Sequence, residues 1–191
     1  MRVNYLYIPT SKDIYGFKPK NKIFLDKSSK KLCGKFRKGH FEGVLNVVNR
    51  FIEIIKPKYI YLGKKDYQQL FLIKKHIEKR KIKSRIIECE TIRENNGVAC
   101  SSRNSKLNKN QIEVASNIHN YLRNLKKKIR KNYNLFNINK IRKDLINLGA
   151  NKIDYVENYN IKSFKRILKS NKNFNLFFAY YIKNIRLIDN I

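Results

Sequence analysis

The chain has 191 residues, 42% hydrophobic and 12% aromatic, which is enough to bury the core of one or two small domains. Lys and Arg total 44 against 14 Asp and Glu, which gives a formal net charge of +30. No run of about 18 apolar residues exists, and the first residues lack a signal peptide's apolar segment. These features argue against membrane insertion and export, and we expect a globular, cytoplasmic protein.

The positive charge is typical of nucleic-acid-binding proteins. It is densest at residues 27–38, 74–85 and 126–131, and it accompanies abundant Asn and Ile, a composition that an AT-rich coding sequence produces. No array of alternating Arg and aromatic residues is present. We interpret the charge as a solvated basic surface with salt-sensitive, nonspecific affinity for RNA, and a functional nucleic-acid surface is the alternative.

The first half of the chain is predicted to form an α/β pattern. Its expected elements are a strand at 3–8, a loop or short helix from 9, a helix from 39 to Pro57, a buried strand at 59–62, a helix at 66–80 and a strand at 85–89. The last three make a βαβ unit, which is expected to cross over right-handed.

The second half is predicted to form a separate α/β unit. Its expected elements are a long amphipathic helix capped by Asn108 or Asn110 and running to 130, a helix at 138–148 stopped by Gly149, a strand near 153–156, a helix at 161–168, a loop at 170–175, and strands at 176–182 and 185–188.

A polar motif at residues 63–69 follows the strand predicted at 59–62. Gly63 ends that strand, and Asp66 is placed to cap the next helix. Open α/β sheets bind ligands at the carboxyl ends of their strands, where Lys65, Asp66 and Gln69 would lie. The motif therefore indicates a phosphate-binding edge, although two lysines in a Lys-rich chain are also typical of solvated surface.

A second motif, residues 100–104, follows an Asn-Asn-Gly turn. Ser101, Ser102 and Arg103 supply hydroxyl and guanidinium donors beside several backbone N–H groups, a combination that favours an oxyanion. Ser-Ser-Arg is equally common in ordinary loops. Cys100 is interpreted as a small hydrophobe, with a reactive thiol as the alternative, and the three cysteines show no Cys-x-x-Cys spacing that would indicate zinc or a disulfide framework.

Five ordered segments carry a resemblance: residues 5–10, 32–44, 63–69, 100–104 and 186–190. On these segments the chain resembles the pantothenate synthetase family, the pantoate and β-alanine ligases of the nucleotidyltransferase superfamily. The family opens with a loop that carries two histidines around a glycine, then a pantoate-contacting glutamine segment. Neither is present, and His40, His76 and His119 lie far apart, so the chain resembles an N-terminally truncated member.

The resemblance implies an α/β architecture in two parts. Residues 1–100 would form the C-terminal part of a doubly wound, Rossmann-like nucleotide-binding domain, and residues 101–191 a small α/β C-terminal lid domain. It also implies either a homodimer or a partner chain that supplies the missing N-terminal half, and activity that depends on that half.

The resemblance further implies a two-step reaction. The pantoate carboxylate attacks the α-phosphorus of ATP, which arrives with Mg²⁺, and β-alanine then displaces AMP from the pantoyl-adenylate. The implied residues are Lys65, Ser101, Ser102 and Arg103 for catalysis; these four with Gly63, Lys64, Asp66, Ile92 and Cys100 for ATP binding; Gln69 for pantoate; and Arg37 and His40 near the acyl substrate. His40 is equally interpretable as a cap or core residue, and His76 and His119 as structural or exposed.

Two other functions stay open. The chain is interpretable as a non-catalytic folded remnant that serves as a binding or oligomerisation module, or as a basic nucleic-acid-binding protein. Neither a specific nucleic acid nor a membrane is expected as a partner.

Overall fold

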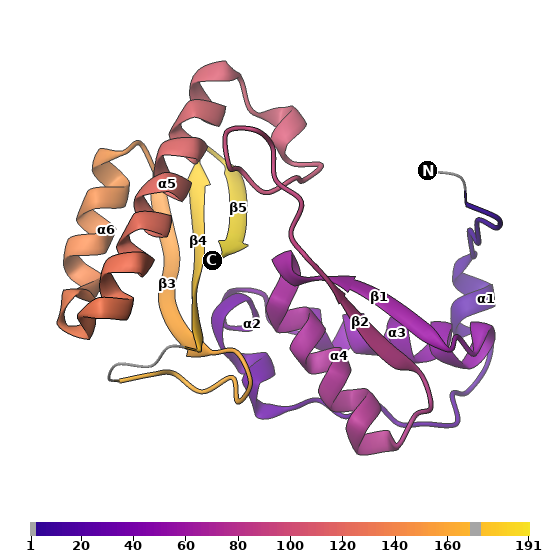
Figure 1. Cartoon of the computed structure of the whole chain (residues 1–191). Coiled ribbons are helices and arrows are strands. Elements are labelled where there is room, and N and C mark those ends of the chain that lie inside the picture. Colours follow the sequence, from indigo (N-terminus) through magenta and orange to yellow (C-terminus); the bar gives the residue numbers. More distant parts are fainter. Residues whose placement is uncertain (1–2, 169–172) are drawn as a thin grey trace.

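The computed structural model describes residues 3–168 and 173–191 and contains two sheets flanked by helices (Figure 1). This mixed arrangement confirms the predicted α/β class. Before the first sheet come α1 (Ser11–Tyr15), the 3-10 helix η1 (Lys27–Lys30), α2 (Leu32–Phe36) and α3 (His40–Ile55). Helix α1 begins at a capping box between Thr10 and Asp13, so of the loop or short helix predicted from residue 9 the structure contains the short helix.

The first sheet is a parallel pair, β1 (Tyr59–Gly63) and β2 (Arg85–Cys89), joined by the 3-10 helix η2 (Lys64–Asp66) and α4 (Tyr67–Arg80). This confirms the predicted βαβ unit. Helices α3 and α4 pack on one face of the pair through an apolar cluster. The prediction of a buried strand at 59–62 is wrong, because the other face is left exposed: Tyr59 and Tyr61 are 41% and 68% exposed.

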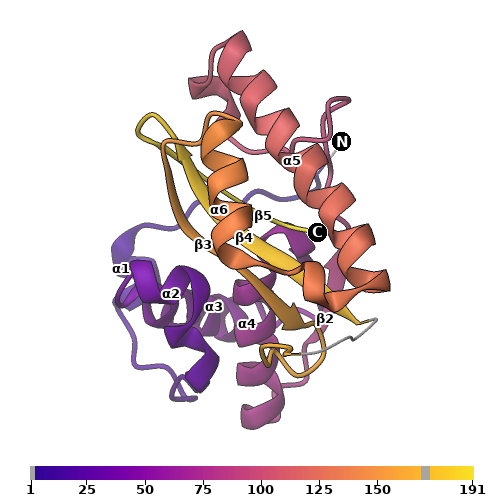
Figure 2. The same cartoon turned by 90° about the vertical axis from the view of Figure 1, so that its left-hand side faces the viewer.

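The second sheet is antiparallel, in the order β3-β4-β5. The elements of this part are η3 (Asn104–Lys106), α5 (Lys109–Lys131), η4 (Tyr133–Leu135), α6 (Ile138–Asn147), β3 (Lys152–Asn160), β4 (Phe174–Ile182) and β5 (Ile185–Asn190). A capping box between Asn108 and Gln111 starts α5, and Gly149, at φ 106°, follows α6. Figure 2 shows α5 and α6 lying against one face of this sheet.

The opposite face of the antiparallel sheet packs on the earlier part of the chain. Tyr155 of β3 and Phe177 of β4 share an apolar cluster with Leu32, Phe41 and Phe71. Because this contact joins the two sheets through α2, α3 and α4, the C-terminal strand β5 reaches the turn after β1. The asparagine at the end of β5, Asn190, hydrogen-bonds to that turn.

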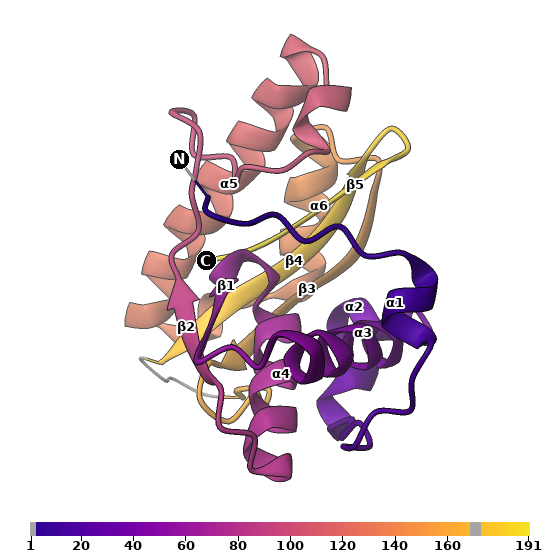
Figure 3. The same ribbon diagram turned by 90° about the vertical axis from the view of Figure 1, so that its right-hand side faces the viewer.

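Two predicted elements are wrong. Residues 3–8 are coil and not a strand (Figure 3), because no strand in the described part of the chain pairs with them, and Tyr5 is 95% exposed. Residues 161–168 form turns and not a helix. The side chain of Asn160 accepts from the backbone N–H groups of Lys162 and Ser163, and the buried Phe164 lies at φ 50°, a left-handed conformation that a continuing helix does not allow.

The loop predicted at 170–175 lies partly outside the described residues, and Phe174 and Asn175 belong to β4. The domain boundary at residue 100 stays a prediction; it falls in the loop between β2 and η3. None of the helices that the structure describes is long and apolar enough to span a membrane.

Candidate functional site

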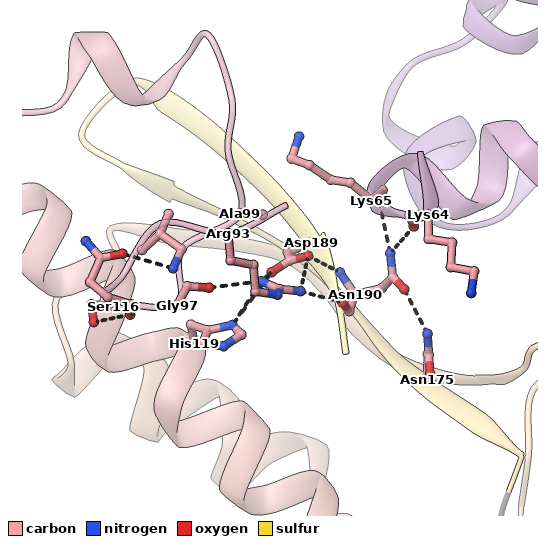
Figure 4. A network of polar contacts seen from close by, with 12 residues as sticks. Lys64, Lys65, Arg93, Gly97, Ala99, Ser116, His119, Asn175, Asp189 and Asn190 are labelled. Atoms are coloured by element: carbon pink, nitrogen blue, oxygen red, sulfur yellow. Dashed lines mark hydrogen bonds and ion pairs between the residues drawn. The ribbon is translucent and has the colours of Figure 1, made fainter. Parts of the chain in front are cut away.

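The turn after β1 is held from the opposite end of the chain. Asn190 donates from Nδ2 to the backbone oxygens of Lys64 and Lys65, at 2.8 and 3.0 Å, while its Oδ1 accepts from Asn175 (Figure 4). The chain direction through η2 is therefore fixed by β5. Asp66 occupies the position before α4, but its carboxylate makes no capping hydrogen bond, so the predicted cap is wrong and that carboxylate stays exposed.

Lys65 lies where two small cavities meet. The first, of about 30 Å³, is also lined by Ser101 and Arg103. The second, of about 40 Å³, is also lined by Arg37, His40, Asp66 and Gln69, and Lys65, Ile188 and Asp189 line both. Within the described part of the chain, the Lys65 amino group has no ion pair or hydrogen bond, so its charge is available to an anion.

The serine and arginine of the second motif face the first cavity in a fixed conformation. Ser101 accepts at Oγ from the Arg103 backbone N–H, at 3.2 Å, and the Arg103 guanidinium donates to the backbone oxygen of Arg186, at 3.1 Å. Asn104 lines the same cavity, and its buried Oδ1 has no hydrogen-bond partner among the described residues. The first cavity therefore combines two cations, a hydroxyl, an unused acceptor and the carboxylate of Asp189, which is paired with Arg93.

The second cavity is electropositive around His40. Arg37 donates from Nη1 to Nε2 of His40, at 2.8 Å, which makes that nitrogen the acceptor. Burial lowers the pKa of His40, and Arg37, Arg186 and Arg103 lower it further, while Asp66 opposes them. Gly39 is the N-cap of α3, and His40, the first residue of the helix, lines the second cavity beside Arg37, so the structure favours a residue that faces the cavity over a cap.

Five of the predicted residues line neither cavity: Gly63, Lys64, Ile92, Cys100 and Ser102. Lys64 forms an ion pair with Glu90, which raises the pKa of its amino group. Ile92 is 71% exposed, and Cys100 and Ser102 are also exposed. An exposed Cys100 does not behave as a packed small hydrophobe, and its backbone N–H pairs with the oxygen of Ile92.

A buried ion-pair cluster behind the first cavity was not predicted. Arg93 donates from Nη1 and Nη2 to the Asp189 carboxylate, at 2.6 and 3.1 Å, and His119 Nδ1 lies 3.7 Å from the same carboxylate (Figure 4). Gly97, at φ 86°, approaches so closely that an added Cβ would lie 2.7 Å from the His119 ring. The sequence signal was a carboxylate and an amide, Asp189 and Asn190, ending an apolar strand.

A second unpredicted cluster supports the second cavity. Arg186 donates from Nε to Asp154, at 2.7 Å, and its guanidinium also lies 3.8 Å from the Cys33 sulfur. The Cys33 sulfur is 3.0 Å from the Tyr155 hydroxyl, and burial followed by the neighbouring Cys33 raises the pKa of Tyr155. These contacts join α2 to the antiparallel sheet and so hold the walls of the cavity together.

The arrangement is suited to binding an anion and stabilising charge that develops on it. Lys65 and Arg103 meet at one cavity, and Arg37 lies beside the other. Both cavities are small, about 30 and 40 Å³, and Lys65 lines the two of them.

The family described as pantoate-beta-alanine ligase matches residues 1–191. A pantothenate synthetase from Flavobacterium psychrophilum is 36% identical over 193 residues, covering 97% of this chain and 67% of its own length. One from Francisella tularensis subsp. mediasiatica is 35% identical over 194 residues, covering 98% of this chain and 64% of its own length. This chain therefore spans about two thirds of the length of these relatives.

Two solved structures are also similar to this chain. The Francisella tularensis pantoate-beta-alanine ligase, complexed with beta-gamma ATP and beta-alanine, has a TM-score of 0.70 at 35% identity over 94% of this chain and 61% of its own. Pantothenate synthetase from Thermus thermophilus has a TM-score of 0.83 at 23% identity over 96% of this chain and 67% of its own, a likeness of fold alone.

Proposed function

The chain belongs to the pantoate-beta-alanine ligase family, and from that premise we propose that it supplies the phosphate-binding and pantoate-binding groups of an ATP-dependent ligase. One observation carries the proposal: Lys65 lines both the cavity with Ser101 and Arg103 and the cavity with His40 and Gln69. A cation shared by the two places is what a reaction between a carboxylate and a phosphate requires.

In the first step, an oxygen of the pantoate carboxylate forms a bond to the α-phosphorus of ATP. The bond to the β-phosphate bridging oxygen breaks, and pyrophosphate leaves with its electron pair. Lys65 and Arg103 offset the negative charge on the phosphates, and Ser101 donates a hydrogen bond to them. Gln69 hydrogen-bonds to pantoate, and Asp66 accepts from the ribose hydroxyls.

In the second step, the amine of β-alanine attacks the acyl carbon of pantoyl-adenylate. The amine loses a proton to solvent water, AMP leaves with the electron pair of the acyl carbon–oxygen bond, and the amide of pantothenate forms. His40 accepts a hydrogen bond from Arg37 at Nε2, so we assign it to holding the guanidinium toward the carboxylate substrates.

Mg²⁺ is assigned to the phosphates of ATP. Among the described residues, no group of three His, Cys, Asp or Glu side chains is placed to hold a metal ion. An ion held by phosphate oxygens and water needs no such group, because Mg²⁺ keeps several of its waters. Its contribution in that position is to neutralise charge on the leaving pyrophosphate.

We assign the exposed face of the first sheet to further polypeptide, corresponding to the family's N-terminal part that this chain does not match. Parallel sheets normally have both faces covered, yet Tyr59, Tyr61 and Ile87 are 41%, 68% and 37% exposed on this pair. The apolar segment at 3–8 is also exposed, with Leu6 at 77%, and its Tyr7 lines a groove together with Tyr59. Added strands would cover this surface and bring the missing histidine motif to the site.

ATP binding by the Lys65→Ala variant tests the assignment. We expect affinity to fall about tenfold, or about 1.4 kcal/mol, because the free ammonium is lost from the phosphate site. The matched control is Lys106→Ala, which removes the same charge from an exposed residue of η3 that lines neither cavity. Titration calorimetry at about 0.15 M salt limits the contribution of the overall charge.

Equal affinities of Lys65→Ala, Lys106→Ala and the unchanged chain for ATP would contradict the site. Turnover is measured separately, as AMP formation from ATP, Mg²⁺, pantoate and β-alanine, with each acyl partner omitted in turn. We expect pantoate-dependent AMP only when the N-terminal third of a family member is co-expressed. ATP binding without turnover in that complex would contradict the ligase assignment while leaving the nucleotide site intact.

A further inference from the structure

A large groove lies at the end of the first sheet opposite the candidate site. Its walls include Pro57 and Lys58, just before β1, and Lys83 and Ser84, just before β2. Because the two strands are parallel, their starts meet at one edge, whereas Lys65 follows the other end of β1. The groove has a volume of about 940 Å³, against about 30 and 40 Å³ for the cavities of the candidate site.

The groove is more basic than the chain as a whole. Seven of its fifteen lining residues are Lys or Arg, compared with 44 of 191 in the sequence: Lys18, Lys20, Lys56, Lys58, Arg80, Lys81 and Lys83. All seven are exposed. A high lysine content spread evenly along the chain would give the groove the same fraction of Lys and Arg as the whole sequence. The fraction in the groove is about twice as high, so the fold gathers these residues there.

The one acidic side chain of the groove is already engaged. Both oxygens of Glu53 accept backbone N–H groups, those of Lys20 at 2.8 Å and Asn21 at 2.9 Å. None of the seven cations forms an ion pair with an acid in the described part of the chain. The positive potential of the groove is therefore not neutralised from within.

Helix ends account for part of this charge. Lys56 and Lys81 cap the C-termini of α3 and α4, at φ 49° and 52°, and Arg80 precedes the second cap. Cations there offset the helix dipole. Lys18 and Lys20 belong to the coil after α1, and Lys58 and Lys83 precede strands, so these lysines have no such structural role.

We propose that this groove binds single-stranded RNA through the phosphates of its backbone, independently of base sequence. Several cations along an open groove match consecutive phosphates, and the half-buried Phe17 supplies one aromatic ring on which a base can stack. The groove is larger than one phosphate needs, and its ligand would not compete with ATP at the other end of the sheet.

The test compares two variants that lose the same charge. The groove variant carries Lys18→Gln, Lys20→Gln, Lys58→Gln and Lys83→Gln. The control carries Arg123→Gln, Lys127→Gln, Lys128→Gln and Lys131→Gln, all exposed on α5, the last three within the basic run at 126–131. Fluorescence anisotropy with a labelled oligouridylate of about 12 nucleotides measures affinity at several salt concentrations.

We expect the groove variant to bind the oligouridylate at least about thirtyfold more weakly at about 0.15 M salt, and its salt slope to fall by about 3, as losing four single-strand phosphate contacts requires. The control variant should weaken binding only slightly. Circular dichroism shows whether each variant is folded. Equal weakening by both variants, or unchanged binding by a folded groove variant, would overturn the proposal, because the affinity would then follow net charge alone.

Discussion

Asp189 is the residue on which the wall shared by the two cavities depends. Its side chain is only 9% exposed, and its carboxylate accepts hydrogen bonds from Nη1 and Nη2 of Arg93. Burial works against the charged form, but His119 and Arg93 outweigh burial and hold the pKa of Asp189 below its usual range. The same carboxylate accepts the Asn190 backbone N–H and so positions the side chain that holds Lys64 and Lys65.

The Asp189→Asn variant should lose about 3 kcal/mol of unfolding free energy, because it leaves the partly buried Arg93 without its counter-charge. Urea denaturation measures the loss. Glu113→Gln is the control, since Glu113 is exposed on α5 and its replacement should change stability by less than about 0.5 kcal/mol. Similar losses in both variants would show that the Asp189 pair does not stabilise the fold.

At the scale of elements, His76 joins three segments that are distant in sequence. It lies in α4, its Nδ1 accepts the backbone N–H of Phe24, and its Nε2 is 3.0 Å from Oδ1 of Asn49 in α3. Because Nδ1 is an acceptor, the imidazole is neutral with the proton on Nε2. Burial, and then Arg80, lowers the pKa of His76.

The stability contributed by His76 should therefore decrease in acid. The folded-state pKa is below 6.5, so between that value and 6.5 the unfolded chain binds more protons, and stability falls as pH decreases through this window. Urea denaturation of the unchanged chain and of His76→Gln at pH values from 8 to 5 tests this. The range includes about 6.5, the pKa of an unperturbed imidazole. The two stabilities should converge as pH falls, and a constant difference would contradict the account.

At the scale of the whole molecule, two properties oppose each other. A net charge of +30 keeps copies of the chain apart, while the uncovered face of β1 and β2 favours association. The charge repulsion is screened by salt, since the Debye length falls from about 30 Å at 0.01 M to about 8 Å at 0.15 M ionic strength. Contact between apolar side chains is not screened in this way.

The isolated chain should therefore self-associate more as salt rises, which sedimentation velocity measures. Tyr61→Lys with Ile87→Lys should keep it monomeric, because both side chains lie on the uncovered face. Leu135→Lys with Ile146→Lys is the control: these residues are each 46% exposed but lie on η4 and α6. Equal suppression by both pairs would attribute the effect to added charge and not to the uncovered face.

Local signals predicted most of the fold. The alternation of β1 and α4 and the glycine after α6 are encoded within a few residues, so the sequence was sufficient for them, whereas it left Asn108 and Asn110 both open as the cap of α5 and the structure selects Asn108. The strand predicted at residues 3–8 and the helix predicted at 161–168 were wrong. Strand pairing and a turn closed by Asn160 depend on neighbours that an apolar pattern does not reveal.

The sequence by itself determined the family and the two motifs that carry Lys65 and Arg103, because each motif is a short run of consecutive residues. Only the tertiary structure decided which of their residues share a cavity. Lys64 and Lys65 are adjacent, yet Lys64 pairs with Glu90 while Lys65 lines both cavities, and Asn190, 125 residues beyond Lys65, holds the backbone of this turn. Contacts between such distant residues form only when the sheets pack.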